Sequence, residues 1–190
     1  MKCFAVKPDN YNADMVISAL PVLVNAGVNV LYLKDMLSRA EIIKVINALD
    51  KSVIIPIVSH KLMADLAGCS IGIHYKSSEI GLIENKNPGY AVLTASAHDY
   101  DTAKFLLENG ADYVFVSPVF KPLSKQNDKR DLFPLERIIR LTDDFEERVV
   151  LLGGMTNDRI EELKENMGKD FSVAGITMFF EKGRFSNYWM

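Results

Sequence analysis

Short apolar runs alternate with amphipathic stretches about eight times along this chain of 190 residues. Several of the runs are nearly continuous in Val, Ile and Leu, as expected of strands that are buried on both faces. The runs recur at intervals of roughly twenty to thirty residues, a spacing typical of repeated strand–helix units. The expected strands are residues 2–6, 28–33, 53–58, 70–74, 91–94, 113–117, 148–152 and 172–177.

Amphipathic segments between these runs predict the helices. We expect helices at residues 14–26, 38–49, 101–109, 135–141 and 157–165, and a brief one at 61–67. Ser38 followed by Glu41 has the spacing of a capping box, which marks a helix start. The stretch after His74 offers only a helix fragment, and the chain ends soon after the eighth strand, so we expect the fourth and last helices to be reduced.

Eight alternating strand–helix units favour a compact α/β fold, a (β/α)8 TIM barrel. A chain of this length builds one full core and is short for two, and no linker or low-complexity tract divides it. We therefore expect a single TIM-barrel domain over residues 1–190. An open, doubly wound sheet remains the alternative, because counting strands does not prove that the sheet closes.

The charge balance limits the classes of partner. Lys and Arg number 22 against 25 Asp and Glu, for a net charge of −3. Non-specific nucleic-acid binding needs a basic face, so we expect none. No apolar run approaches the eighteen residues of a membrane span, and the apolar stretch within the first ten residues is too short for the apolar region of a signal peptide. We expect a cytoplasmic protein, and we leave open a homo-oligomer formed through outer helices.

In a barrel of parallel strands, functional residues lie where the strands end. Those ends carry lysines, hydroxyls and glycines in a chain whose net charge is negative, which favours an anionic ligand. The residues in question include Lys34, Ser96, His98, Ser124, Lys125, Gly153, Gly154 and Thr177.

The pair Gly153–Gly154, followed by Thr156 and a helix, is the most interpretable of these ends. Glycines let the backbone approach a ligand, and a helix N-terminus presents unpaired N–H groups to an anion. A tight turn that simply needs glycine explains the same pattern. Lys125 suits a diphosphate or a leaving group, but its hydrophilic surroundings equally describe a solvated lysine. Glu79 is a lone carboxylate after the fourth strand and by itself says little about a metal.

Taken in order, these segments resemble the thiamine phosphate synthase family, which includes the thiazole tautomerases. Residues 118–125, PVFKPLSK, are similar to the family pattern P-[VI]-[FY]-x-T-x-T-K. Ser96-Ala97-His98 is similar to S-x-H, and residues 110–113 match G-A-D-Y. Residues 72–74 match G-[IV]-H, and residues 152–156 are similar to [IV]-G-G-[IM]-[TN]. The resemblance covers nearly the whole chain and implies the same barrel fold.

The resemblance implies a transferase of thiamine biosynthesis. Its synthases join an aminomethyl-pyrimidine diphosphate to a thiazole phosphate and release diphosphate, through a pyrimidine carbocation that the thiazole nitrogen captures. Carried over, Lys125 and Ser96 hold diphosphate, and Gly153 and Gly154 bind the thiazole phosphate through backbone amides. Glu79 stands at one magnesium-binding position, so the resemblance implies Mg²⁺ and small phosphorylated substrates. The other substrate-binding candidates are Ser124, His98, Tyr32 and Thr177.

The chain departs from the family pattern at two strand ends. The Q-x-R-x-K after the second strand is here Tyr32-Leu33-Lys34-Asp35-Met36, which keeps one cation at Lys34. The third-strand N-D, whose Asp binds magnesium, falls in Ser59-His60-Lys61 and has no carboxylate. Two alternatives therefore stay open. One is a thiazole tautomerase-like isomerase, although Pro118 occupies the position of its histidine. The other is a non-catalytic barrel that binds a phosphorylated pyrimidine or thiazole.

Overall fold

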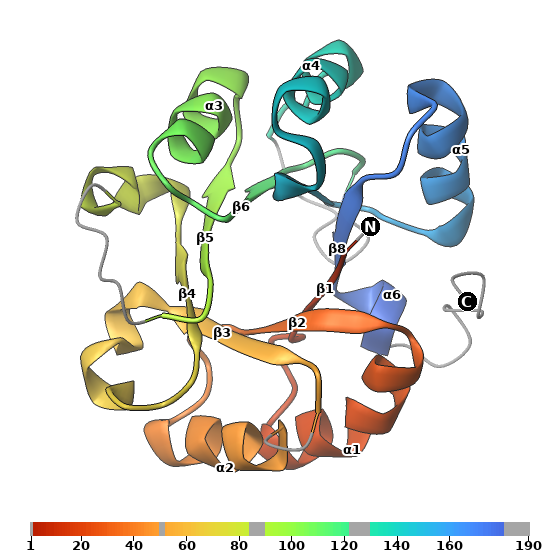
Figure 1. The fold of residues 1–190 in the computed structure, drawn as a ribbon. Helices are drawn as coiled ribbons and strands as arrows, with labels where there is room; N and C mark the ends of the chain where they lie inside the picture. The colour runs from red at the N-terminus through yellow and green to blue at the C-terminus, as the bar shows by residue number, and fades with distance from the viewer. Residues whose placement is uncertain (1, 50–51, 84–89, 122–129, 181–190) are drawn as a thin grey trace.

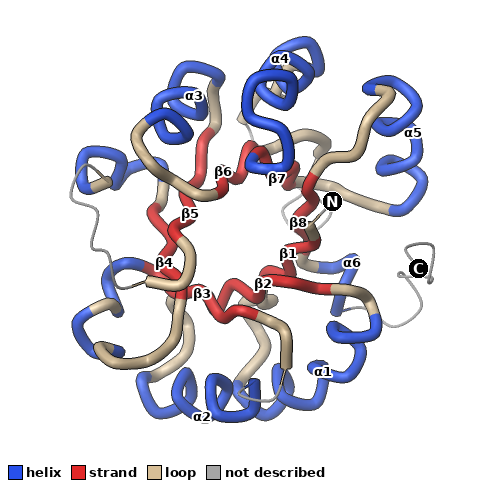
Figure 2. Tube along the Cα trace, viewed as in Figure 1, coloured by secondary structure: helices blue, strands red, loops and turns tan. Residues whose placement is uncertain are grey.

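A computed structural model describes residues 2–49, 52–83, 90–121 and 130–180. Its strands pair in parallel in the order β1 to β8, and the sheet closes into a barrel. Closure is made by β1 and β8, where Cys3 is the partner of Val173. Figure 2 shows the ring of strands with the helices outside it. The predicted single (β/α)8 fold is confirmed, and the open sheet is excluded.

The strands lie close to their predicted positions. They are β1 (Cys3–Val6), β2 (Val28–Leu33), β3 (Ile55–Ser59), β4 (Gly72–Tyr75), β5 (Leu93–Ala97), β6 (Tyr113–Val116), β7 (Val149–Leu152) and β8 (Ser172–Gly175). The prediction for β5 was wrong by two to three residues, so Ser96 lies inside this strand rather than after it. Pairing of Leu93 with Ile73 of β4 sets this register. The apolar run on which the prediction was based begins at residue 91, two residues before the first residue that pairs with β4.

The helices are α1 (Ala13–Asn25), α2 (Arg39–Leu49), α3 (Tyr100–Glu108), α4 (Leu135–Phe145), α5 (Asn157–Met167) and α6 (Thr177–Phe180), with 3-10 turns η1 (His60–Leu62), η2 (Ala64–Leu66), η3 (Ser77–Leu82) and η4 (Glu146–Arg148). Within the described ranges, 3-10 turns and no α-helix follow β3 and β4, and α6 has four residues, which agrees with the predicted reductions after β4 and β8. Among the described residues, no helix is long and apolar enough to cross a membrane.

The helix starts follow from local hydrogen bonds. The side chain of Asn12 accepts from the backbone N–H of Met15 at 2.9 Å and begins α1. In the predicted capping box before α2, the Ser38 N–H donates to Glu41 at 2.9 Å, and the Glu41 N–H donates to Ser38 Oγ at 3.3 Å. Asp99 caps α3, which begins at Tyr100, so His98 lies in the loop before that helix.

The helices surround the barrel (Figure 1). Two apolar clusters make up the core, one inside the barrel and one between the barrel and its helices. Strand β2 shows how alternation divides its side chains: Val30 and Tyr32 face the interior, whereas Leu31 and Leu33 pack outward. Burying an aliphatic side chain of this size contributes about 1.5–3 kcal/mol. The interior set fills the barrel from below and leaves its carboxyl end for a pocket.

Candidate active site

A pocket of about 540 Å³ opens at the carboxyl ends of the strands. Of the sequence-predicted site residues, those that line it are Ser96, Lys34, Gly153, Gly154, His98, Tyr32 and Thr177. Ser124 and Lys125 lie outside the described residues. Glu79 is described but is not among the lining residues. Segments that are far apart in the sequence thus converge on one cavity.

The floor of the pocket is apolar and aromatic. Tyr32 and His74 face each other with ring centroids 4.4 Å apart at an interplanar angle of 37°. His74 also packs 5.2 Å from Phe115, and Leu152 and Ile176 complete the lining nearby. A floor of this kind suits a flat organic ring, with polar groups above it to fix orientation.

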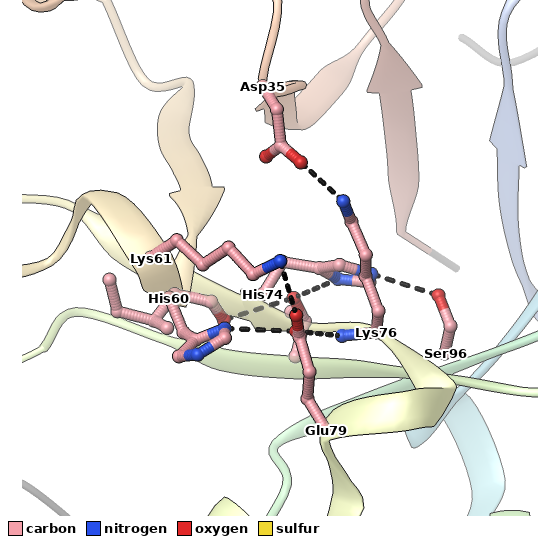
Figure 3. Close-up of polar contacts among 9 residues, drawn as sticks. Asp35, His60, Lys61, His74, Lys76, Glu79 and Ser96 are labelled. Carbon is pink, nitrogen blue, oxygen red and sulfur yellow. Dashed lines mark hydrogen bonds and ion pairs between the residues drawn. The ribbon is translucent and has the colours of Figure 1, made fainter.

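A buried chain of hydrogen bonds runs from Thr94 through His74 to Ser96. The Thr94 hydroxyl donates to the carbonyl of Ile73 at 3.2 Å, and its oxygen lies 2.9 Å from His74 Nδ1. Because the hydroxyl proton is used on the carbonyl, Nδ1–H donates to Thr94 and Nε2 is left as an acceptor. Ser96 Oγ lies 2.9 Å from Nε2 and donates to it (Figure 3). Ser96 therefore presents oxygen lone pairs to the pocket.

Burial keeps His74 neutral. The side chain has almost no contact with solvent, and loss of hydration lowers the pKa of the imidazole to about 3, despite an opposing effect of Glu79. A neutral ring holds its two hydroxyl partners over the whole neutral pH range. His74 thus orients Ser96 and does not serve as a cation.

His98 anchors an arginine at the mouth of the pocket. Its Nδ1 lies 2.7 Å from the carbonyl oxygen of Ser117, which accepts only, so Nδ1 carries the proton. Arg130 Nη1 lies 3.1 Å from Nε2 and 3.2 Å from Nδ1, so the guanidinium group lies against the imidazole ring. Arg130 also lines the pocket. The sequence analysis gave this arginine no role, because it belongs to a hydrophilic stretch that resembles a solvated loop.

Two lysines in the loops after β2 and β4 are each paired with an aspartate that also lines the pocket. Lys34 Nζ lies 3.1 Å from Asp9, and Lys76 pairs with Asp35 (Figure 3). Burial raises the pKa of the Asp35 carboxyl, but the hydrogen bond and charge of Lys76 outweigh it, so the pKa lies below its usual value. We call Lys34, Lys76, Asp9 and Asp35 the lysine wall.

The glycine pair forms a turn between β7 and α5. Gly153 and Gly154 have φ angles of +108° and +62°, which side-chain-bearing residues rarely adopt. A Cβ on Gly153 would lie 2.9 Å from Pro118 Cα, and one on Gly154 would lie 2.5 Å from the carbonyl oxygen of Lys121. Thr156 then caps α5. We call this segment the glycine turn. The positive φ angles explain why glycine stands at both positions, and both glycines line the pocket.

Glu79 is engaged with neighbours away from the pocket. Its carboxylate accepts from the Lys76 backbone N–H at 2.9 Å, lies 2.9 Å from His60 Nδ1 and pairs with Lys61 Nζ at 3.4 Å. Burial raises the pKa of Glu79, but these partners together hold it below its usual value. Among the described residues, no group of three or more His, Cys, Asp or Glu could hold a metal ion. This donor set does not fit magnesium, which prefers several free oxygen ligands.

The fold and the pocket define a (β/α)8-barrel protein with a ligand site at the carboxyl ends of its strands, where barrel enzymes carry their chemistry. A family model described as thiamine monophosphate synthase matches residues 4–178. The chain belongs to this family. The prediction of a thiamine phosphate synthase-like transferase of thiamine biosynthesis is confirmed at this level.

Individual relatives agree with the family assignment. The chain is 24% identical over 187 residues to a protein of Aquifex aeolicus provisionally named thiamine-phosphate synthase 2, covering 95% of this chain and 98% of the relative. It is 26% identical over 170 residues to thiamine-phosphate synthase of Halalkalibacterium halodurans, covering 85% and 80% of the two chains.

A solved structure has the same fold. Thiamine phosphate pyrophosphorylase from Pyrococcus furiosus superposes with a TM-score of 0.74 at 17% identity, covering 96% of this chain and 89% of that one. A 3-hexulose-6-phosphate synthase also superposes, with a TM-score of 0.64 at 15% identity, covering 97% and 94%. At these identities the likeness concerns the fold alone.

Proposed function

We propose that the protein joins an aminomethyl-pyrimidine diphosphate to a thiazole phosphate, forming thiamine phosphate and releasing diphosphate. The observation that carries this proposal is the convergence of the lysine wall and the glycine turn on one pocket with an aromatic floor. A reaction of two phosphorylated rings needs two anion-binding regions and a flat surface between them. Family membership supplies the class of reaction.

The reaction breaks one bond and forms another. The C–O bond between the pyrimidine methylene and diphosphate breaks, and the bonding pair leaves with diphosphate. The resulting carbocation accepts the lone pair of the thiazole nitrogen, which forms the new C–N bond. Cations beside the leaving diphosphate stabilise the charge that develops on it. Lys34 and Arg130 line the pocket where they can do this, and Lys125 is expected to join them.

The glycine turn takes the thiazole phosphate in this proposal. Gly153 and Gly154 line the pocket, their lack of side chains lets the turn pack against Pro118 and the Lys121 carbonyl, and the capped N-terminus of α5 follows directly. Helix N-termini attract anions through unpaired N–H groups and the helix dipole. Thr177, at the start of α6, adds a hydroxyl to the same side of the pocket.

We give Ser96 a different partner from the one that the resemblance implied. Its hydroxyl proton is held by His74 at 2.9 Å, so its oxygen is ready to accept a hydrogen bond. The amino group of the pyrimidine is a suitable donor. Tyr32 and His74 offer the ring faces on which the pyrimidine would lie.

Four further assignments are not tested. Magnesium is implied by the resemblance, but Glu79 does not fit it, and no step here runs through a metal. Cytoplasmic location and the absence of nucleic-acid binding are expected from the sequence, and a homo-oligomer stays open. The tautomerase alternative needs a base, and His98 is a poor one because its Nδ1 is bonded to the Ser117 carbonyl and a guanidinium cation, Arg130, lies against its ring.

A direct assay tests the proposed function. Purified protein is mixed with the pyrimidine diphosphate and the thiazole phosphate, with and without magnesium, and thiamine phosphate is measured. Product formed in step with released diphosphate supports a synthase. Absence of product in both buffers, together with measurable binding of the thiazole phosphate, would instead favour the non-catalytic barrel. The Lys125→Ala variant is expected to lose turnover far more than affinity for the thiazole phosphate.

A further inference from the structure

We propose that side-chain cations take the place of a divalent metal at the diphosphate end of the pocket, with Lys76 leaving Asp35 to bind the diphosphate. This inference rests on the proposed function. It concerns a lysine that the sequence analysis gave no role, and it predicts that diphosphate binds to this chain without magnesium.

The first step concerns the carboxylate at the expected metal position. Both oxygens of Glu79 have neighbours: Oε2 accepts from the Lys76 N–H at 2.9 Å and lies 2.9 Å from His60 Nδ1, and Oε1 pairs with the Lys61 ammonium at 3.4 Å. A divalent ion would have to displace these groups and then sit beside the Lys61 ammonium. The third-strand segment Ser59-His60-Lys61 adds no carboxylate. The place that a metal would occupy is therefore already neutralised by the protein.

The second step concerns Lys76 itself. It follows β4 directly, and its backbone N–H is tied to Glu79, which fixes where the side chain starts. The ammonium reaches the carboxylate of Asp35, which follows β2, and both residues line the pocket (Figure 3). The raised pKa of Lys76, caused first by its hydrogen bond to Asp35, keeps this ammonium charged. A fixed positive charge thus stands where the ligand enters.

The third step is an exchange of partners. The Lys76 and Asp35 side chains are 43% and 37% exposed, and ion pairs exposed to this degree are weak. A diphosphate carries several negative charges and offers more acceptor oxygens than one carboxylate, so it competes well for the ammonium. Lys34 makes the same kind of pair with Asp9 on the same wall. In the pocket lining, three cations, Lys34, Lys76 and Arg130, outnumber the two carboxylates.

Calorimetric titration with inorganic diphosphate tests this inference without any turnover. Binding is measured once in excess EDTA and once in excess magnesium. We expect the affinity in EDTA to be no more than about threefold below that in magnesium. A larger gain from magnesium, or no binding in either buffer, overturns the inference.

Two variants with opposite expected effects on diphosphate affinity, both measured in EDTA, make the test sharper. Lys76→Met should weaken diphosphate binding about tenfold, because it removes a cation. Asp35→Asn should strengthen it about threefold, because it removes the competing carboxylate. A metal site that used Asp35 would lose affinity in Asp35→Asn, and that result overturns the proposal. Lys104→Met is the matched control, since Lys104 pairs with Glu108 on α3 and does not line the pocket.

The outcomes separate this inference from the proposed function. Diphosphate binding in EDTA without any formation of thiamine phosphate keeps the inference and refutes the synthase. Formation of thiamine phosphate with diphosphate binding that depends on magnesium keeps the synthase and refutes the inference. Unfolding experiments in urea on both variants establish that any change in affinity belongs to a folded protein.

Discussion

In the proposed function, the lysine wall and the glycine turn attract anions by different physical means. On the lysine wall the charge belongs to long side chains that are held by aspartates, and the pair of Lys76 with Asp35 is more than a third exposed. On the glycine turn the attraction comes from backbone, at positions where a Cβ would meet other atoms at 2.9 Å and 2.5 Å. Anion binding at the lysine wall should depend on side-chain charge and tolerate changes of side-chain shape. Anion binding at the glycine turn should depend on shape and be insensitive to side-chain charge.

This difference shows what each region needs to keep its function. Side-chain ion pairs are screened by salt and can change partners. The backbone N–H groups of a turn with positive φ angles and no room for a methyl group cannot change partners in this way and are screened less by salt. The turn holds these groups in place without loss of side-chain entropy. Conservative changes of charge should therefore affect only the lysine wall, and the smallest change of volume should affect only the glycine turn.

The largest effect at neutral pH should come from Gly154→Ala, with Gly168→Ala as its matched control. Both glycines have nearly the same φ, +62° and +64°, but a Cβ on Gly168 would meet nothing within 4 Å. Gly154→Ala should lower the free energy of unfolding by about 3 kcal/mol and Gly168→Ala by about 1 kcal/mol. Affinity for the thiazole phosphate should fall about 100-fold only in the first. Equal losses in both variants would show that backbone strain alone matters.

The next effect concerns His74, which lies on the floor between the two regions. Its pKa of about 3 in the folded state is below its ordinary value of 6.5. Below pH 6.5 the unfolded chain therefore binds a proton that the folded protein does not. Stability should fall as the pH drops from about 6.5 towards 3, by up to about 1.4 kcal/mol per pH unit.

Urea unfolding of the protein and of His74→Gln over this acid range checks the prediction. The variant should show a shallower acid loss, because it has no imidazole to protonate in the unfolded state. Parallel pH curves for the two proteins would mean that His74 is accessible to protons in the folded state.

A smaller effect is expected from Lys34→Met. It removes one cation from the lysine wall and leaves Asp9 without this partner. Affinity for inorganic diphosphate should fall about tenfold, whereas affinity for the thiazole phosphate should change less than about twofold. Equal losses for both ligands would break the division between the two regions.

The smallest effect is that of salt. Raising the sodium chloride concentration from about 0.05 M to about 0.5 M shortens the Debye length to a few ångströms. Diphosphate binding should weaken by about three- to fivefold, more than binding of the thiazole phosphate. If salt weakened thiazole phosphate binding more than diphosphate binding, the exposed side-chain charges would act at the glycine turn and not at the lysine wall.

The sequence predicted the two regions unequally. The glycine turn could be predicted because its two adjacent glycines and the residue that caps the following helix are close together in the sequence. The pairs of Lys34 with Asp9 and Lys76 with Asp35 were not visible, since they join loops 25 and 41 residues apart that only closure of the barrel brings together.

The errors in the strands have a similar origin. Residues 91–94 are the more apolar part of their segment, but pairing with β4 and β6 places the strand at Leu93–Ala97. Small residues such as Ala95 and Ala97 are fully buried there by their neighbours, which the sequence pattern does not reveal. The engagement of Glu79 with His60 and Lys61 likewise depends on contacts between two turns, η1 and η3.

Calorimetric titration of the thiazole phosphate into protein saturated with inorganic diphosphate tests most directly whether one pocket holds two separate anion-binding regions. The account predicts that the thiazole phosphate still binds, with an affinity within about threefold of that for the free protein. Loss of thiazole phosphate binding in the presence of diphosphate would show a single shared anion site and contradict it.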